Sequence, residues 1–146
     1  MKKIALLLVF LNSFLISAQE YEYKIVTCVE SIVPNGLGRS RMIDVEDKRD
    51  FKESSTEHTE GRNKTDRSDL RVEHFEETKL LNFYNLGGIR FENIATNDAI
   101  ISSKINTLAT QGWELMQVVS GVESDSGSND GQGIYITRLI FKKKKQ

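Results

Sequence analysis

Near its C-terminal end the chain carries a helical pattern that runs directly into an alternating one, and this pairing constrains the fold more than any other feature. Ile101, Ile105 and Leu108 are spaced by four and three residues, which places them on one stripe of a helix. The opposite face is polar. We therefore predict a helix over 98–111, with Asn97 as its N-cap. The apolar stripe marks the face that packs against the rest of the domain.

A strand is predicted directly after this helix. Gly112 stands where a left-handed residue commonly ends a helix, and residues 113–120 then alternate in polarity. Trp113 begins this strand. We expect its side chain to lock the helix against the sheet, and we favour this role over stacking on a ligand. A loop over 121–133, rich in Gly, Ser and Asp, leads to a final alternating strand over 134–141. The four lysines after it are sufficient to blunt a sheet edge and keep it soluble.

Two strands joined by a turn are predicted between Tyr21 and Val45. The residues from Tyr21 to about Val33 alternate between two faces, which is typical of a strand. A turn follows, marked by Pro34 and by Gly36 and Gly38, and residues 41–45 then alternate again. We expect this second strand to return beside the first.

The segment from Asp44 to Arg71 is too charged to contribute much to a core. Sixteen of its 28 residues are charged, and its only large apolar residues are Val45, Phe51 and Leu70. We expect a mobile excursion over 46–69. The alternative is a solvent-exposed hairpin with a tip formed by Glu60, Gly61, Arg62 and Asn63.

Apolar residues return after this segment. They become dense from Leu80 to Leu86, where the aromatic content and the closing Gly87 and Gly88 favour a buried strand over a helix. An irregular link to the predicted helix is then expected to pack through Ile89, Phe91 and Ile94.

These elements predict an α+β fold, in which one main helix at about 98–111 packs on one face of a small antiparallel β-sheet. Residues 19–146 form a single domain in this interpretation, with the charged excursion at about 46–69. A chain of this length suffices for one core and buries about two thirds of its unfolded surface.

The first 18 residues have the features of an export signal. Lys2 and Lys3 precede an almost unbroken apolar run over 4–16, and small residues close it before a cleavage site expected after Ala18. The run is shorter than the roughly 20 apolar residues of a membrane helix, so an uncleaved anchor or a buried helix is disfavoured. We expect export to the periplasm or the medium, with no stable membrane anchor. A lipid anchor is not expected, because the only cysteine, Cys28, lies ten residues beyond the cut.

Charge and cysteine content narrow the classes of partner. Without Lys2 and Lys3 the mature chain has 18 basic against 21 acidic residues, a net charge of −3. This balance gives no general attraction to nucleic acid or to anionic lipid. A single cysteine cannot form an internal disulfide, so the fold must rest on packing, and Cys28 either pairs between chains or stays free.

Several segments carry a resemblance to known sequences. The stretch Ile105–Phe141, with Tyr23–Val29 as its leading strand, resembles a family of small bacterial domains of unknown function marked by a helix that runs into Gly-Trp-Glu. The segments Glu30–Ile43 and Lys79–Gly88 resemble parts of uncharacterised exported proteins of Gram-negative bacteria. The resemblance implies a compact antiparallel sheet with one packed helix, and it implies no activity. The charged excursion departs from the pattern of the small domains.

The strongest candidate for a binding site is a glycine-rich turn with two arginines, formed by Gly36, Gly38, Arg39, Ser40 and Arg41. Backbone amides in a concave turn and two guanidinium groups suit a carboxylate or phosphate, on a small anionic ligand or a protein partner. Alternation would place Arg39 and Arg41 on one strand face, about 7 Å apart at roughly 3.3 Å per residue. The spacing matches neither a phosphate-binding loop nor a dinucleotide fingerprint, and a plain hairpin turn is the alternative.

Other reactive or metal-binding side chains have simpler structural explanations. His58 and His74 are sixteen residues apart without close ligands, so solvated histidines are favoured over a metal site. Cys28 lacks a neighbouring histidine, which favours packing over catalysis. The spacing of a calcium loop is not matched by Glu123, Asp125, Asn129 and Asp130. No metal or cofactor is expected.

The sequence therefore favours a non-enzymatic binding or assembly module, because polar loops accompany a core and no catalytic constellation is recognisable. Homo-oligomerisation stays open. The alternative is a cell-envelope hydrolase in which an Asp or Glu of the loop at 121–133 acts with His74. Only spatial proximity of these groups would support that alternative.

Overall fold

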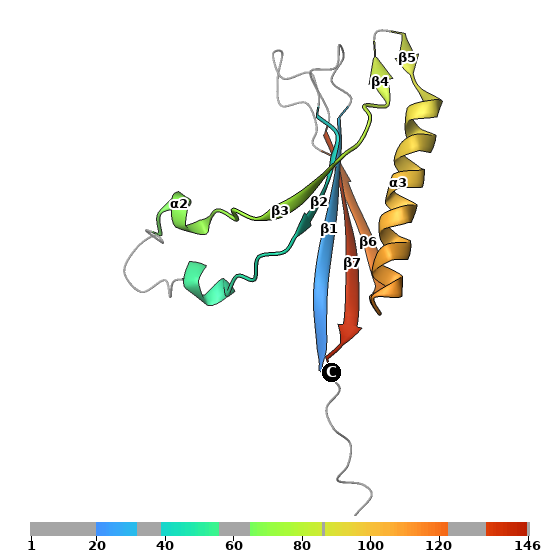
Figure 1. Ribbon diagram of the computed structural model, residues 1–146. Coiled ribbons are helices and arrows are strands. Elements are labelled where there is room, and N and C mark those ends of the chain that lie inside the picture. Colours follow the sequence, from blue (N-terminus) through green and yellow to red (C-terminus); the bar gives the residue numbers. More distant parts are fainter. Residues whose placement is uncertain (1–19, 32–38, 56–64, 86, 123–133, 146) are drawn as a thin grey trace, which may run out of the picture.

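A five-stranded antiparallel sheet with one long helix forms the body of the protein (Figure 1). The computed structural model describes residues 20–31, 39–55, 65–85, 87–122 and 134–145. In chain order the elements are β1 (Tyr21–Ser31), β2 (Arg41–Val45), the 3-10 helix η3 (Phe51–Ser54), α2 (Arg67–Leu70), β3 (Phe75–Lys79), β4 (Tyr84–Asn85), β5 (Gly88–Ile89), α3 (Phe91–Thr110), β6 (Glu114–Val122) and β7 (Ile134–Lys144). The α+β class and the antiparallel sheet with one main helix are confirmed.

The first and last strands form the centre of the sheet. The strand order is β3-β2-β1-β7-β6, and β1 pairs with β7 from Tyr21 opposite Lys144 to Ser31 opposite Ile134. The expected return of the second strand beside the first is confirmed by the pairing of β1 with β2. The lysines at the end of β7 do not blunt a sheet edge, because β1 and β6 flank this strand. That expectation was wrong, since only the pairing of distant strands decides which of them lies at an edge.

The core lies between α3 and one face of the sheet. Leu108 of the predicted stripe is a buried core residue. Ile101 and Ile105 of the same stripe are partly buried and pack against the core, as do Ile100 and Trp113. The position of Trp113 agrees with the expectation that it locks the helix to the sheet. The buried apolar residues of the core are Val26, Cys28, Met42, Leu80, Leu108, Leu139 and Phe141.

The helix begins seven residues earlier than the sequence pattern predicts. It spans Phe91–Thr110, and its N-cap, Arg90, makes no side-chain cap hydrogen bond. Asn97 therefore lies inside the helix and is not its N-cap, which corrects that prediction. Asn97 is 1 % exposed and bonds the segment that follows β3, where its oxygen accepts from Leu81 N at 2.8 Å and its Nδ2 donates to Leu81 O at 2.8 Å. A polar residue that looks like a cap from local sequence is thus a tertiary contact.

The predicted buried strand over 80–86 is also wrong. The strand in this region, β3, ends at Lys79 and is largely exposed, whereas Leu80 is buried. The chain then leaves the sheet and forms a small hairpin from β4 and β5, with Gly88 at φ +94°. The Asn97 amide satisfies the backbone of Leu81, as a neighbouring strand otherwise would. The apolar residues over 80–85 therefore belong to the connection between the sheet and α3. Ile89 lies in β5 and Phe91 in α3, and not in an irregular link.

The junction from α3 to β6 follows the prediction closely. Gly112 has φ +86°, and the amides of Gly112 and Trp113 donate to Ala109 O and Leu108 O at 3.0 Å each. The alternation after it is interrupted, because the pairing of β6 with β7 shifts by one residue between Leu115 and Gln117. Such a bulge changes which side chains share a face.

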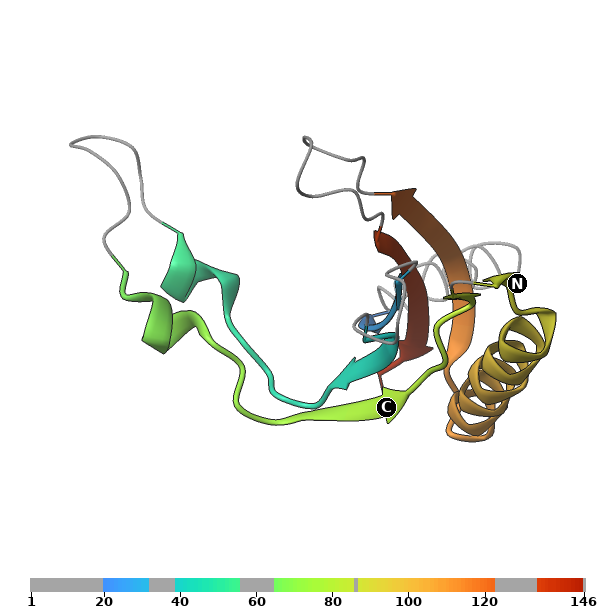
Figure 2. The same ribbon diagram turned by 90° about the horizontal axis from the view of Figure 1, so that it is seen from above.

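An arm extends from the sheet beyond β2 and β3, and its described parts are residues 46–55 and 65–74 (Figures 1 and 2). Its two limbs carry η3 and α2, neither of which has a buried residue. Arg49 joins the limbs by donating to Asp69 O at 3.3 Å and to Arg71 O at 2.6 Å. The alternative hairpin tip at 60–63 lies outside the described residues, as does the expected export signal. Mobility of the excursion stays a prediction.

Among the described residues, none of the helices combines the length and the apolar character needed to cross a lipid bilayer.

Candidate functional site

Within the residues that the structure describes, one face of the sheet has no helix over it. Val26 and Cys28 of β1 are buried on the side of α3. Because side chains alternate along a strand, Thr27 and the residues two positions apart from it point away from α3. Figure 2 shows α3 on one side of the curved sheet, with the arm reaching past the other side. We call the side opposite α3 the open face.

Apolar side chains occupy the middle of the open face. Ile25 is 47 % exposed and stands opposite Ile140, while Val119 is 44 % exposed and stands opposite Arg138. Thr27, the neighbour of Ile25 on this face, stands opposite Ile43. Other apolar residues at open-face positions are Tyr23, Val29, Val45, Phe75 and Ile136. This concentration of exposed apolar side chains is a surface suited to another protein.

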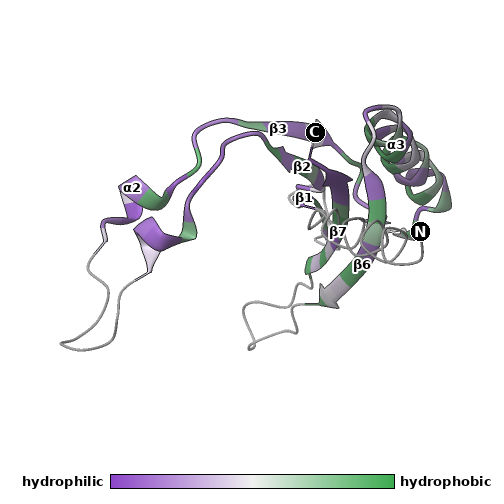
Figure 3. Ribbon diagram, turned by 90° about the horizontal axis from the view of Figure 1, so that it is seen from below, coloured by the Kyte–Doolittle hydropathy of each residue, from purple (hydrophilic) through white to green (hydrophobic). Residues whose placement is uncertain are grey.

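Strand β6 adds an apolar edge to this surface. It is the outermost strand on its side of the sheet, and every residue along it is exposed. Its sequence, ELMQVVSGV, has one charged residue, Glu114, and Figure 3 shows its hydrophobic stretches in green. Long apolar edge strands are templates for pairing with another chain.

The predicted arginines line a depression at the opposite edge of the sheet. Arg39, Arg41 and Lys79 share it with the segment 80–82 and with Asn93 of α3. Arg41 and Lys79 are directly paired across β2 and β3. Arg39 precedes β2, and Gly36 and Gly38 lie outside the described residues, so the predicted glycine turn stays a prediction.

A buried polar network lies behind this depression. Ser40 is 1 % exposed, and its N and Oγ both donate to Asn82 Oδ1, at 3.2 and 2.7 Å. Asn93 Nδ2 donates to Asn82 O at 2.7 Å, and Leu80 N donates to Ser40 O at 3.1 Å. Sequence reasoning missed Lys79 and Asn82, because they approach the arginines only through the pairing of β2 with β3. Ser40 is buried beneath the depression and does not line it.

A charged cluster connects α3 to the sheet nearby. The Asp44 side chain is 6 % exposed and contacts Lys24 Nζ at 2.7 Å and Lys104 Nζ at 2.9 Å. Lys104 also contacts Glu76 at 2.7 Å. Burial raises the pKa of the Asp44 carboxyl, but the hydrogen bonds and the positive charges of Lys24 and Lys104 together lower it by more, so the pKa lies below its ordinary value of 3.8. Each charged group of the cluster is paired with another group of the cluster, which is typical of a structural role.

Cys28 lies in the core and is 2 % exposed. Burial, with the nearby negative charge of Glu30, raises the pKa of its thiol from 9.0 to about 11. A thiolate is needed for nucleophilic attack or disulfide exchange. The position agrees with packing, and pairing between chains would require the core to open.

We therefore expect the native protein to resist thiol reagents. At pH 8 a thiol with this pKa is ionised to only about one part in a thousand, and burial also blocks access. The reaction with a chromogenic disulfide reagent should be at least about 100-fold slower than in denaturant. Absorbance of the released thiol measures it, and rapid modification of the folded protein would contradict burial of Cys28.

The histidine within the described residues is on the surface. The His74 side chain is 78 % exposed and its Nδ1 lies 3.6 Å from Asp47 Oδ1, while the His74 backbone amide donates to Asp47 Oδ2 at 3.3 Å. The loop at 123–133 and His58 lie outside the described residues. Across the described ranges, no three His, Cys, Asp or Glu side chains are grouped so that they could hold a metal ion.

Comparison of the chain with models of protein families, with curated proteins and with solved structures found no match.

Proposed function

We propose that the protein is a non-enzymatic assembly module that binds a second copy of itself through the open face. The observation that carries this proposal is the exposed apolar centre of that face, where Ile25 and Val119 are each almost half exposed on a sheet that α3 covers from one side only. We place this assembly outside the cytoplasm, because residues 1–18 have the features of an export signal.

We expect the two copies to associate by packing their open faces against each other. A sheet with two apolar faces is stable when both are covered, and two sheets pack face to face at about 10 Å with their side chains interleaved. In a two-fold dimer the same patch serves both subunits, so one exposed apolar patch is sufficient. The interface must also accommodate charged groups. Arg138 lies between Thr27 and Val119 in the register, Glu77 stands opposite Ile43, and Arg41 stands opposite Val29.

Replacing Ile25 and Val119 together by lysine should abolish self-association. The change places two charges where an apolar contact would form, and burying an unpaired charge costs several kcal/mol. Sedimentation velocity across a range of concentrations measures the association. The wild-type protein should sediment as a dimer or larger species, and the double variant as a monomer.

Phe91→Lys is the matched control, because Phe91 is 74 % exposed at the start of α3 and not on the open face. It should leave the association unchanged. A wild-type protein that stays monomeric at high micromolar concentration would overturn the proposal, as would equal loss of association in the control.

A further inference from the structure

We infer that the depression lined by Arg39, Arg41 and Lys79 is a binding site for a small oxyanion, a phosphate or carboxylate group. The site adjoins the open face, because Arg41 stands opposite the open-face residue Val29, but the inference does not depend on the self-association proposed above. Cations from two neighbouring segments meet here: Arg39 precedes β2, Arg41 begins β2, and Lys79 ends β3. Guanidinium and ammonium groups that converge in this way are the usual ligands of such anions.

The positive charge of the depression is only partly neutralised within the described part of the chain. Among the described residues, Arg41 has a carboxylate partner, Glu77, whose Oε1 accepts from Arg41 Nε at 2.6 Å. Arg39 and Lys79 are exposed and have no ion pair within that part of the chain. Three cations and one bound carboxylate leave a local excess of two positive charges. A dianion would balance that excess.

The guanidinium group of Arg41 is also held in place. Arg41 donates from one terminal nitrogen to Ser40 O at 2.7 Å and from Nε to Glu77, which leaves its second terminal nitrogen to face a ligand. Ser40 is fixed in turn by its two hydrogen bonds to Asn82 Oδ1. A preorganised donor loses less entropy when it binds than a free surface side chain does. The buried Ser40–Asn82 network is therefore what distinguishes this depression from a chance grouping of surface charges.

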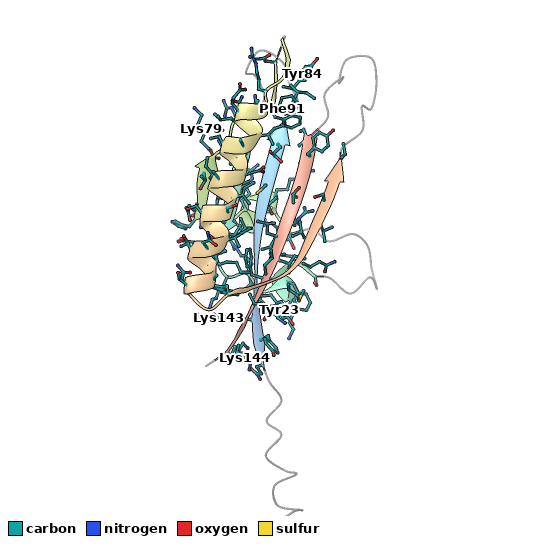
Figure 4. All side chains as sticks on the ribbon, turned by 90° about the vertical axis from the view of Figure 1, so that its right-hand side faces the viewer. Tyr23, Lys79, Tyr84, Phe91, Lys143 and Lys144 are labelled. Atoms are coloured by element: carbon teal, nitrogen blue, oxygen red, sulfur yellow. The ribbon has the colours of Figure 1, made fainter. Side chains whose placement is uncertain are left out.

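The lysines at the end of β7 form a basic region that lacks these features. Lys143 and Lys144 lie near Tyr23 at the end of the body opposite Lys79 and Tyr84 (Figure 4). There Lys142 contacts Glu114 at 3.4 Å and the Lys143 ammonium lies 5.7 Å from the centre of the Trp113 ring. These lysines are largely engaged with their own surroundings. The comparison locates the anion site at the β2–β3 edge.

Titration of the protein with inorganic phosphate, and separately with succinate, tests the site. At low ionic strength, saturable shifts of the backbone amide signals of Ser40, Arg41 and residues 79–82 are expected in a heteronuclear NMR spectrum. Saturation by phosphate alone would support a phosphate-bearing ligand, saturation by succinate alone a carboxylate-bearing one, and saturation by both the shared oxyanion chemistry. The absence of saturable shifts with either anion would overturn the inference.

The double variant Arg39→Gln/Lys79→Gln should raise the Kd at least about tenfold, because it removes two charged hydrogen-bond donors while keeping polar side chains. Both residues are exposed, so the dispersion of the spectrum should be retained. Lys48→Gln/Lys144→Gln is the matched control, since it removes the same charge from exposed positions outside the depression. Equal weakening in the control would show general screening of charge and would also overturn the inference. The readout is ligand binding, so it is distinct from loss of the dimer.

Discussion

Replacing Asn97 by alanine should reduce the free energy of unfolding by about 2–4 kcal/mol. The side chain is buried and bonds both backbone groups of Leu81 at 2.8 Å, and its Nδ2 also lies 3.2 Å from Glu30 Oε1. Alanine would leave the Leu81 N–H and C=O without these partners and open a small cavity beneath the helix. Each unsatisfied buried group costs about 1–3 kcal/mol. Urea denaturation followed by circular dichroism measures the change.

Two further variants separate the hydrogen bonds from the volume of the side chain. Asn97→Asp fills the same space but turns a carboxylate toward Leu81 O and Glu30, so it should not restore stability at neutral pH. Asp98→Ala, at the next and exposed position of α3, should change stability by less than about 0.5 kcal/mol. If Asn97→Asp were as stable as the wild type, the bonds to Leu81 would not be what holds the helix to the segment after β3.

Replacing Asp44 by alanine should cost a similar amount, about 2–4 kcal/mol, because it leaves Lys24 and Lys104 partly buried without their shared carboxylate. The Lys104 side chain is 14 % exposed and would keep only Glu76, which is itself half exposed. Glu77→Gln is the control. It breaks the exposed ion pair with Arg41, and such pairs contribute about 0–1 kcal/mol.

The same cluster predicts how stability depends on pH. Because the pKa of Asp44 is lowered in the folded protein, its contribution is present above about pH 4 and is lost as the pH falls through the folded pKa. For Lys104, burial lowers the pKa, but hydrogen bonds to Glu76 and Asp44 raise it by more, so it lies above 10.5. Its contribution is present below pH 10.5 and is lost only as the pH rises through that higher value.

Urea denaturation of the wild type and of Asp44→Ala at several pH values measures this dependence. The stability difference should be constant from about pH 5 to 9 and should shrink below pH 4. A difference that grew toward low pH would contradict the lowered pKa of Asp44.

Local sequence determined the elements whose pattern is set by immediate neighbours. Alternation of polarity predicted β1, β2, β6 and β7, and the spacing of Ile101, Ile105 and Leu108 predicted the C-terminal part of α3. Gly112 ends the helix because its backbone has a positive φ, a property of the residue itself. These predictions needed no knowledge of what lies across the domain, and they were sufficient for the α+β class.

Tertiary structure decided everything that depends on residues distant in sequence. Asn97 looks like a helix cap because caps and buried amides use the same side chain, and only the approach of Leu81 shows which one it is. The lysines of β7 lie in the middle of the sheet, and Lys79 joins Arg39 and Arg41, because strand order and register bring them there. The apolar residues of the open face were recognised as strand residues from their alternation. That none of the described helices covers them follows only from the side of the sheet on which α3 packs, since alternation marks two faces and cannot tell which of them is left open.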